Sequence, residues 1–273
     1  MSSTCEITLQ GEIKFCTFTH FNSTGLVVHG FTCRTGGVST GPYASLNTAF
    51  HVGDSSANVL MNRELVCRAL GMDAGKLVAG TQVHGDGVRV VEKRDLGRGA
   101  LCSEDSFPDT DALITGQRGV PISSYYADCV PVFVLDPVKK AVAVSHAGWK
   151  GTALRIACRT VEKMKAAFGT DPADCLAGIG PSIGPCCYEV DETVAGRFRE
   201  NFVYWDELVV PVSPGKWRLN LWEFNRRILL EAGVKSGNIV TAAICTSCRN
   251  DLFFSYRAQG GTAGRAAALI MLK

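Results

Sequence analysis

Three side chains in this sequence form a plausible metal-binding set. Five histidines occur, and two of them stand in unusual local settings: His84 lies in GTQVHGDG, and His146 ends the apolar run AVAVS before AGWKGT. Cys129, in YYADCVP, begins another apolar run. Two imidazoles and one thiolate suit Zn²⁺, and three protein ligands leave a fourth tetrahedral position open, as in catalytic zinc sites. The alternative is that the histidines are unrelated strand-end residues and Cys129 is a core thiol.

A predicted hairpin brings two of these three residues together. Val130–Asp136 and Ala141–Ser145 read as buried strands, and PVKK reads as the turn between them. Adjacent antiparallel strands lie about 5 Å apart, so Cys129 and His146 would emerge at the same open end. His84 must then arrive from a separate loop, which the sequence does not place.

Further candidate residues lie around these three. Asp128 is predicted to act as a general base or as a partner of a ligand histidine, or else to bond local amides at a strand start. The segment HAGWKGTALR places glycines and Lys150 at a predicted helix start, where free amides attract anions, although an ordinary helix start fits equally. Arg34 and Asn47 flank a glycine-rich loop that either cradles an anion or simply turns. Asn47 and Gln82 are the predicted substrate contacts.

The 12 cysteines are scattered along a large chain, which favours reduced thiols over a disulfide framework. Cys186 and Cys187 are adjacent and would supply a nucleophile beside a histidine, or else two half-buried thiols. Cys245 and Cys248 form a C-x-x-C motif. Without a second pair, this motif supports neither a zinc knuckle nor a strong redox assignment.

Strand and helix signals alternate along the chain, with hairpins among them. The sequence predicts a layered α/β (α+β) sandwich with a mixed β-sheet and a single domain over residues 1–273. Ala266–Leu272 is ambiguous between strand and helix. The other predicted strands are Val27–Thr32, Leu77–Ala79, Val88–Glu92, Asp111–Thr115 and Ile239–Cys245, and the predicted helices are Ser56–Leu70, Thr152–Phe168, Asp191–Phe202 and Asn220–Ala232.

Composition excludes several classes of protein. The 273 residues are 46% apolar and carry a formal net charge of +2, which is too balanced for an extended nucleic-acid footprint. Apolar runs fall short of the roughly 20 residues that a membrane span needs. The first residues show neither a basic head nor an apolar stretch of signal-peptide length, so we expect a cytoplasmic protein. The sequence leaves the oligomeric state unknown.

Several ordered motifs together resemble one known family. TQVHG, ADCVP, SHAGWKGT, IGPSIGPCCYEV and CTSC…FFSYR…GTAGR are similar to the laccase-domain family, also called the multicopper polyphenol oxidase-like or purine nucleoside phosphorylase family. The resemblance runs from about Gly30 to the C-terminus. It implies that His84, Cys129 and His146 are the metal ligands. Lys150 stands where family members more often have arginine, so a point charge would replace a bidentate fork if that position contacts an anion.

The resemblance also implies an activity. It points to a zinc enzyme that cleaves adenosine, inosine, guanosine and methylthioadenosine with phosphate and deaminates adenosine, in a layered α/β fold. Arg34 and Lys150 would hold the phosphate, and Asp128 would carry protons. Copper is the less favoured metal, because five histidines without an H-x-H pair cannot fill a multicopper oxidase site.

Other functions stay open at the level of sequence. One is a cysteine hydrolase with Cys129 or Cys186 as nucleophile and His146 as base. Another is a copper-dependent polyphenol oxidoreductase. A third is a zinc-bearing module that binds nucleotides or a partner protein without turnover.

Overall fold

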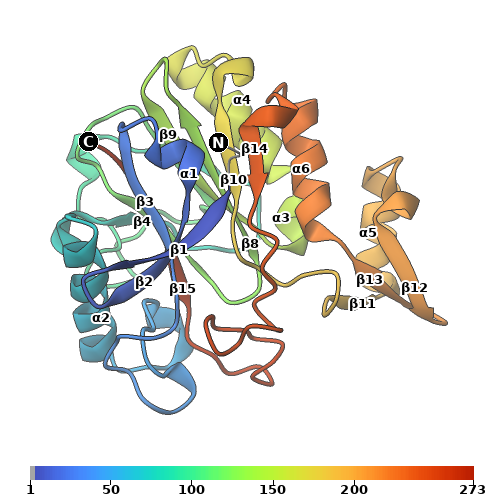
Figure 1. Ribbon diagram of the computed structural model, residues 1–273, viewed down its shortest axis with the longest axis horizontal. Helices are drawn as coiled ribbons and strands as arrows, with labels where there is room; N and C mark the ends of the chain where they lie inside the picture. Colours follow the sequence, from blue (N-terminus) through green and yellow to red (C-terminus); the bar gives the residue numbers. More distant parts are fainter. Residues whose placement is uncertain (1–3) are drawn as a thin grey trace.

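Two six-stranded sheets pack face to face in the computed structural model, which describes residues 4–273 (Figure 1). In spatial order, the first sheet contains β1 (Cys5–Gln10), β2 (Ile13–Phe18), β3 (Val27–Thr32), β15 (Ala266–Leu272), β7 (Ile122–Tyr126) and β4 (Val78–Ala79). The second contains β14 (Ile239–Thr241), β10 (Leu176–Ile179), β8 (Val130–Asp136), β9 (Ala141–Ala147), β6 (Ala112–Thr115) and β5 (Val88–Val90). Both sheets mix parallel and antiparallel pairs, which confirms the predicted layered fold with mixed sheets.

The alternation of side chains along β8 shows how the layers are held. Phe133 and Leu135 point into the core between the sheets, where they join Phe18 and Tyr126 of the first sheet. Val132 and Val134 join the core on the opposite face of the second sheet. Because neighbouring side chains of a strand point to opposite faces, a strand that is apolar at every position must be covered on both sides.

Helices supply the outer layers. α4 (Ile156–Phe168) and α6 (Leu221–Glu231) cover the second sheet, where Val161, Met164 and Phe224 pack against its strands. α2 (Ser56–Ala69) covers the first sheet, with Val66 and Cys67 in the core beneath it. Of the short helices, α1 (Thr19–Asn22) connects β2 to β3, and α3 (Trp149–Ala153) connects β9 to α4.

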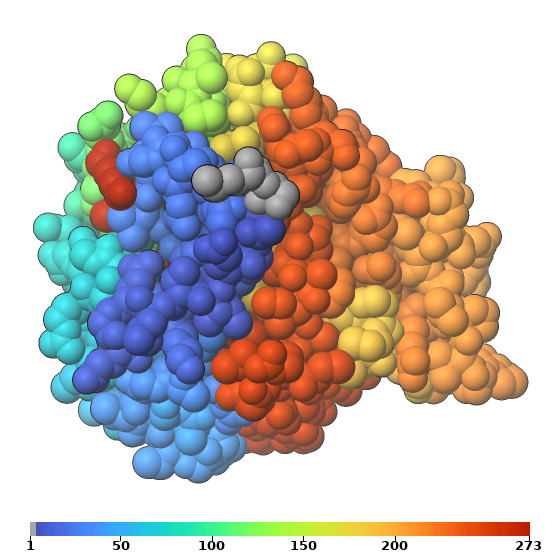
Figure 2. All heavy atoms as spheres, viewed as in Figure 1, coloured from blue at the N-terminus to red at the C-terminus, as the bar shows by residue number. Residues whose placement is uncertain are grey.

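A small lobe stands out from the sandwich (Figures 1 and 2). It contains α5 (Glu192–Asn201) and a three-stranded sheet of β11 (Glu189–Asp191), β13 (Lys216–Leu219) and β12 (Val209–Ser213). Phe198 and Phe202 pack against Phe224 of α6 and anchor the lobe to the main body.

Most predicted elements are confirmed within a few residues, but one predicted helix is divided, one ambiguous segment is resolved and one predicted strand is shorter. The helix predicted over Thr152–Phe168 is two helices, because Arg155 adopts a left-handed backbone with φ of 60° between α3 and α4. The ambiguous segment Ala266–Leu272 is strand β15, paired with β3 and β7. The predicted strand Ile239–Cys245 ends at Thr241.

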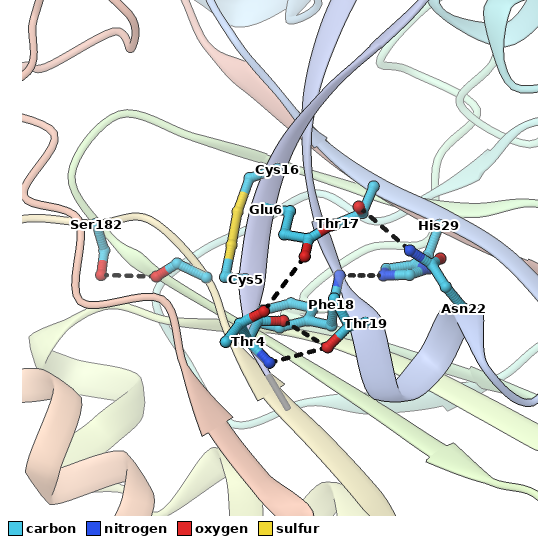
Figure 3. Close-up of a disulfide and its surroundings, with 11 residues drawn as sticks. Thr4, Cys5, Glu6, Cys16, Thr17, Phe18, Thr19, Asn22, His29 and Ser182 are labelled. Atoms are coloured by element: carbon cyan, nitrogen blue, oxygen red, sulfur yellow. Dashed lines mark hydrogen bonds between the residues drawn. A yellow bond between two sulfur atoms is a disulfide. The ribbon is translucent and has the colours of Figure 1, made fainter. Parts of the chain in front are cut away.

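The expectation of reduced thiols throughout is wrong for Cys5 and Cys16, which form a disulfide across the β1–β2 hairpin (Figure 3). Cys5 pairs with Phe18 and Ile7 pairs with Cys16, so the two cysteines are diagonal neighbours on one face. Their Cα atoms lie 6.4 Å apart, within the range that a disulfide spans. Neither strand of this hairpin was predicted, so the spacing of the two cysteines offered no reason to pair them.

No helix within residues 4–273 combines the length and the apolar character needed to cross a membrane.

Candidate metal centre

The β8–β9 hairpin positions two of the predicted ligands. Pro131 pairs with His146 and Val130 with Ala147 in the antiparallel ladder, and Cys129 immediately precedes β8. The predicted hairpin is therefore confirmed, and it places Cys129 and His146 at one end of the second sheet. His146 is 3% exposed, so its ring is fixed by packing as well as by the strand.

His84 reaches the same place from the loop between β4 and β5. Its backbone is left-handed, with φ of 60°, in a turn that the sequence pattern did not predict. The carboxylate of Asp111 holds this turn by accepting the backbone N–H groups of Val83, His84 and Gly85 at 2.8 to 3.1 Å. Asp111 therefore acts as the anchor that brings a distant loop to the hairpin.

The three side chains form one cluster. Candidate ligand atoms of His84, Cys129 and His146 all lie within 4.8 Å of one another, and the two imidazole centroids are 4.8 Å apart. Gly148 leaves room for them, because a Cβ added there would lie only 2.8 Å from Cys129 Sγ and 3.2 Å from His84 Cδ2. The glycine of HAGW is thus required by close approach to the cluster.

Asp111 also orients the buried histidine. Its Oδ1 lies 2.9 Å from His146 Nδ1, so Nδ1 carries the proton that it donates to this carboxylate and Nε2 is left for the cluster. A histidine that ligates a metal usually donates its other ring N–H to such an acceptor. Sequence reasoning placed Asp111 only at a strand start. An aspartate that precedes a buried strand was the available signal.

The electrostatics favour an ionised thiol. Burial alone would raise the pKa of Cys129, but the neighbouring rings of His146 and His84 outweigh burial and lower it to about 6. Burial likewise opposes protonation of His146, yet the Cys129 sulfur and Asp111 raise its pKa to about 9. The cluster therefore presents a thiolate next to a cationic ring when no other cation is bound.

The cluster opens into a pocket of about 500 Å³, a volume typical of small-molecule sites. Aromatic side chains form much of its wall, and Arg257 and Arg265 add positive charge. Partial desolvation at the pocket wall and the nearby Arg265 cation lower the pKa of His51 to about 4, so this pocket residue is a neutral imidazole at pH 7. Sequence analysis assigned no role to these three residues, although Arg257 and Arg265 end the motifs FFSYR and GTAGR that carry the family resemblance.

Besides the three candidate ligands, two predicted site residues line the pocket, and their polar groups form hydrogen bonds with other parts of the protein. The Gln82 amide exchanges hydrogen bonds with the backbone of Tyr125 in both directions. Asp128 accepts the Thr246 hydroxyl on Oδ1 and the Arg257 backbone N–H on Oδ2, each at 2.7 Å. Its φ of 84° supplies the bend that turns its side chain toward this wall.

Three other predicted site residues lie outside the pocket lining. Arg34 donates to the carbonyl oxygens of Ala44 and Asn250. Asn47 is fully buried, and its Oδ1 accepts the backbone N–H of Arg265. Lys150 is exposed on α3, with its ammonium 5.5 Å from the centre of the Trp149 ring.

The donor chemistry fits a borderline metal ion. The donors match the ligand types of catalytic zinc. They are two imidazoles, one thiol with a lowered pKa, and a carboxylate that is hydrogen-bonded to one of the imidazoles. Cys186, the alternative nucleophile, lies in a separate group of four cysteines rather than beside His146.

Comparison with known proteins agrees with this geometry. Residues 28–273 match the family described as multi-copper polyphenol oxidoreductase laccase. The purine nucleoside phosphorylase YlmD of Geobacillus stearothermophilus is 41% identical over 248 residues, covering 89% of each chain. The adenosine deaminase RL5 of an unknown prokaryotic organism is 36% identical over 224 residues, covering 82% of this chain and 85% of that protein.

A solved structure shares the fold across nearly the whole length. The crystal structure of YlmD from Geobacillus stearothermophilus superposes with a TM-score of 0.93 at 37% identity and covers 98% of both chains. The sequence match and the shared fold lead to one assignment. This chain is a member of the multi-copper polyphenol oxidoreductase laccase family of enzymes, and its His-Cys-His cluster lies in the matched region.

Proposed function

We propose that this protein is a zinc-dependent purine nucleoside phosphorylase that also deaminates adenosine. The observation that carries the proposal is the three-donor cluster facing a pocket of about 500 Å³ lined by aromatic rings and two arginines. Relatives at 38 to 41% identity named purine nucleoside phosphorylase, and one named adenosine deaminase, support it. The proposed substrates are adenosine, inosine, guanosine and methylthioadenosine.

His84, Cys129 and His146 would hold the zinc ion. When bound there, zinc supplies a Lewis acid with one open position beside the substrate. Asp111 keeps the His146 tautomer and the His84 loop in place for this role. Nitrogen and sulfur donors also suit copper, so copper is the alternative metal that elemental analysis must exclude.

Phosphorolysis requires that phosphate be held against the sugar. A phosphate oxygen forms a bond to C1′ as the C1′–N9 bond breaks, and the purine leaves with the electron pair and takes up a proton. Arg265 is the best placed cation: it lines the pocket, and its hydrogen bonds to Ala263 and Gly264 use only Nη1. Asn47 positions Arg265 by accepting its backbone N–H. Arg34 and Lys150, outside the lining, would act on phosphate only indirectly.

The purine base would lie among the aromatic side chains. Trp149, Tyr188 and Tyr256 line the pocket and offer faces for stacking. Neutral His51 accepts a hydrogen bond from a sugar hydroxyl. Gln82 shapes the wall beside them with its amide fixed to Tyr125.

Deamination would use the same pocket with water in place of phosphate. The oxygen of water replaces the amino group at C6 of adenine, and ammonia leaves. Asp128 is the proposed proton carrier, but both of its oxygens already accept hydrogen bonds. This geometry supports a positioning role for Asp128, in which it links the Cys129 turn to the backbone of Arg257.

The test is inosine turnover with and without phosphate. We expect hypoxanthine and ribose 1-phosphate to form only when phosphate is present, and inosine to form from adenosine in its absence. Hypoxanthine release at the same rate with and without phosphate would refute phosphorolysis.

Tight nucleoside binding without turnover would instead identify a binding module. Activity that survives metal removal and is killed by labelling Cys129 would identify a cysteine hydrolase. We also propose a cytoplasmic location, which cell fractionation tests.

A further inference from the structure

Four cysteines meet at a second place in the molecule. Cys186 and Cys187 come from the turn after β10, and Cys245 and Cys248 come from the turn after β14. Their sulfur atoms all lie within 4.8 Å of one another, although about 60 residues of chain separate the two pairs. Cys248 Sγ lies 3.5 Å from Cys186 Sγ and 3.4 Å from Cys187 Sγ.

We propose that these four cysteines form a second metal site, a closed tetrahedral zinc site with four thiolate ligands. Sulfurs bound to zinc at about 2.3 Å stand roughly 3.8 Å apart in a tetrahedron, close to the distances observed here. Four protein ligands leave no position for water or substrate. The site is therefore structural, unlike the three-donor cluster in the pocket.

The backbone around Cys245 supports a thiolate rather than a buried thiol. The N–H of Gly184 donates to Cys245 Sγ at 3.2 Å, from the opposite turn. Such donors stabilise negative charge on sulfur, which a cysteine that only fills space does not need. Gly184 must be glycine here, because an added Cβ would meet Trp222 at 2.7 Å.

Main-chain hydrogen bonds hold the two turns in a fixed position relative to each other. Ser182 and Cys245 form a parallel bridge, with Ser182 N–H donating to Ile244 O and Thr246 N–H donating to Ser182 O. Three of the four cysteines are partly or fully exposed, so a metal ion can reach them from solvent. The proposed site would clamp these turns together.

The clamp adjoins the pocket. Tyr188 follows Cys187 directly and lines the pocket, and the carbonyl of Cys187 accepts Arg257 Nη1 at 3.0 Å. Thr246, between Cys245 and Cys248, donates to Asp128. Loss of the second metal would therefore loosen one wall of the pocket without removing any ligand of the first.

The experiment counts zinc in protein expressed with zinc and purified under reducing conditions. We expect about two zinc ions per chain in the wild type and about one in each of Cys129→Ser and Cys248→Ser. The double variant should hold none. Cys158→Ser, which alters a free cysteine outside both clusters, is the control and should keep the wild-type count. If Cys248→Ser does not fold, Cys186→Ser on the exposed turn replaces it.

A spectroscopic measurement identifies the type of ligand directly. Cys129→Ser loaded with Co²⁺ should show the intense charge-transfer absorption of tetrahedral cobalt thiolate, and the Cys129→Ser/Cys248→Ser double variant should lose it. Zinc content that is the same in Cys248→Ser and wild type would overturn the proposal. Disulfides among the four cysteines in the freshly purified wild type, with only one zinc bound, would overturn it as well. Neither result depends on turnover of a nucleoside.

Discussion

Within residues 4–273, two clusters of side chains could hold a metal ion, and the two clusters differ in what surrounds them. The pocket cluster combines two imidazoles with one thiolate, sits at the end of a buried hairpin, and has Asp111 behind one ring. The four-cysteine cluster has only sulfur donors on two turns near the surface. Three donors facing a pocket leave space for a substrate, whereas four donors on adjoining turns leave none. The number of donors and what they face thus separate the catalytic role proposed for the first cluster from the structural role proposed for the second.

Removal of the pocket thiolate should have the largest effect. Cys129→Ala deletes one of three ligands, so we expect nucleoside turnover to fall by more than about 100-fold, beyond the loss typical of an outer-shell change. The four-cysteine cluster should keep its metal. Cys175→Ala, which removes another buried free thiol, is the matched control in the turnover assay. Retention of full activity in Cys129→Ala would exclude metal catalysis at this cluster.

Asp111→Asn should have the next largest effect, because it weakens the anchor of both histidines. The Asp111 carboxylate accepts hydrogen bonds from three backbone N–H groups and from the His146 ring, and an asparagine amide cannot accept all of them. We expect zinc affinity at the pocket to fall about 10- to 100-fold, measured by competition with a chelator.

Asp136→Asn provides the control for Asp111→Asn. It alters another buried aspartate that accepts backbone N–H groups, at the far end of β8. Equal zinc affinities in the two variants would show that Asp111 has no special role at the pocket.

Gly148→Ala should produce a smaller loss at the same cluster. The new Cβ would stand 2.8 Å from Cys129 Sγ, and overpacking of this kind costs about 1–3 kcal/mol. We expect zinc affinity to fall about tenfold. Gly237→Ala, with open space around its added Cβ, should leave affinity unchanged. If both variants bind zinc like the wild type, the cluster has room that the structure does not show.

A buried histidine does not by itself form a metal site. His29 is such a histidine and can be compared with the histidines of the pocket cluster. Burial, followed by the nearby His20, lowers the pKa of His29 to about 3, and its Nε2 accepts the Phe18 N–H at 2.8 Å (Figure 3). The unfolded chain binds a proton near pH 6.5, whereas the folded chain does not. Stability is therefore fully present above pH 6.5 and declines as pH falls toward 3.

His29→Gln should flatten that decline. Denaturant unfolding of the wild type and the variant between pH 7 and pH 4 measures it, and zinc content at pH 7 should be the same in both. Parallel stability curves would contradict the assignment of a neutral buried His29.

The sequence predicted the pocket ligands better than it predicted their support. Cys129 and His146 could be paired because a short turn joins two apolar runs, and local patterns of this kind fix a hairpin register. His84 was predicted as the third ligand, but the sequence could not place it, since the turn that brings it to the hairpin depends on Asp111, a residue distant in sequence. Arg257 and Arg265 end the motifs FFSYR and GTAGR, but their place in the pocket depends on contacts with Cys187 and Asn47, which are distant in sequence.

The four-cysteine cluster shows the same limit more sharply. The motif of Cys245 and Cys248 lacked a second pair in sequence, and the fold supplies one as Cys186 and Cys187. That pairing follows from β10 and β14 lying side by side in the second sheet, which is a long-range contact. Strand neighbours of this kind cannot be derived from spacing along one sequence. The disulfide of Cys5 and Cys16 was missed because its hairpin was not predicted.

The most direct test of the account is X-ray absorption at the zinc edge of the Cys248→Ser variant, in which only the pocket cluster should bind metal. The account predicts about one zinc ion per chain, coordinated by two imidazole nitrogens, one sulfur and one light atom from solvent. Copper in place of zinc, an all-sulfur environment, or no bound metal would contradict it.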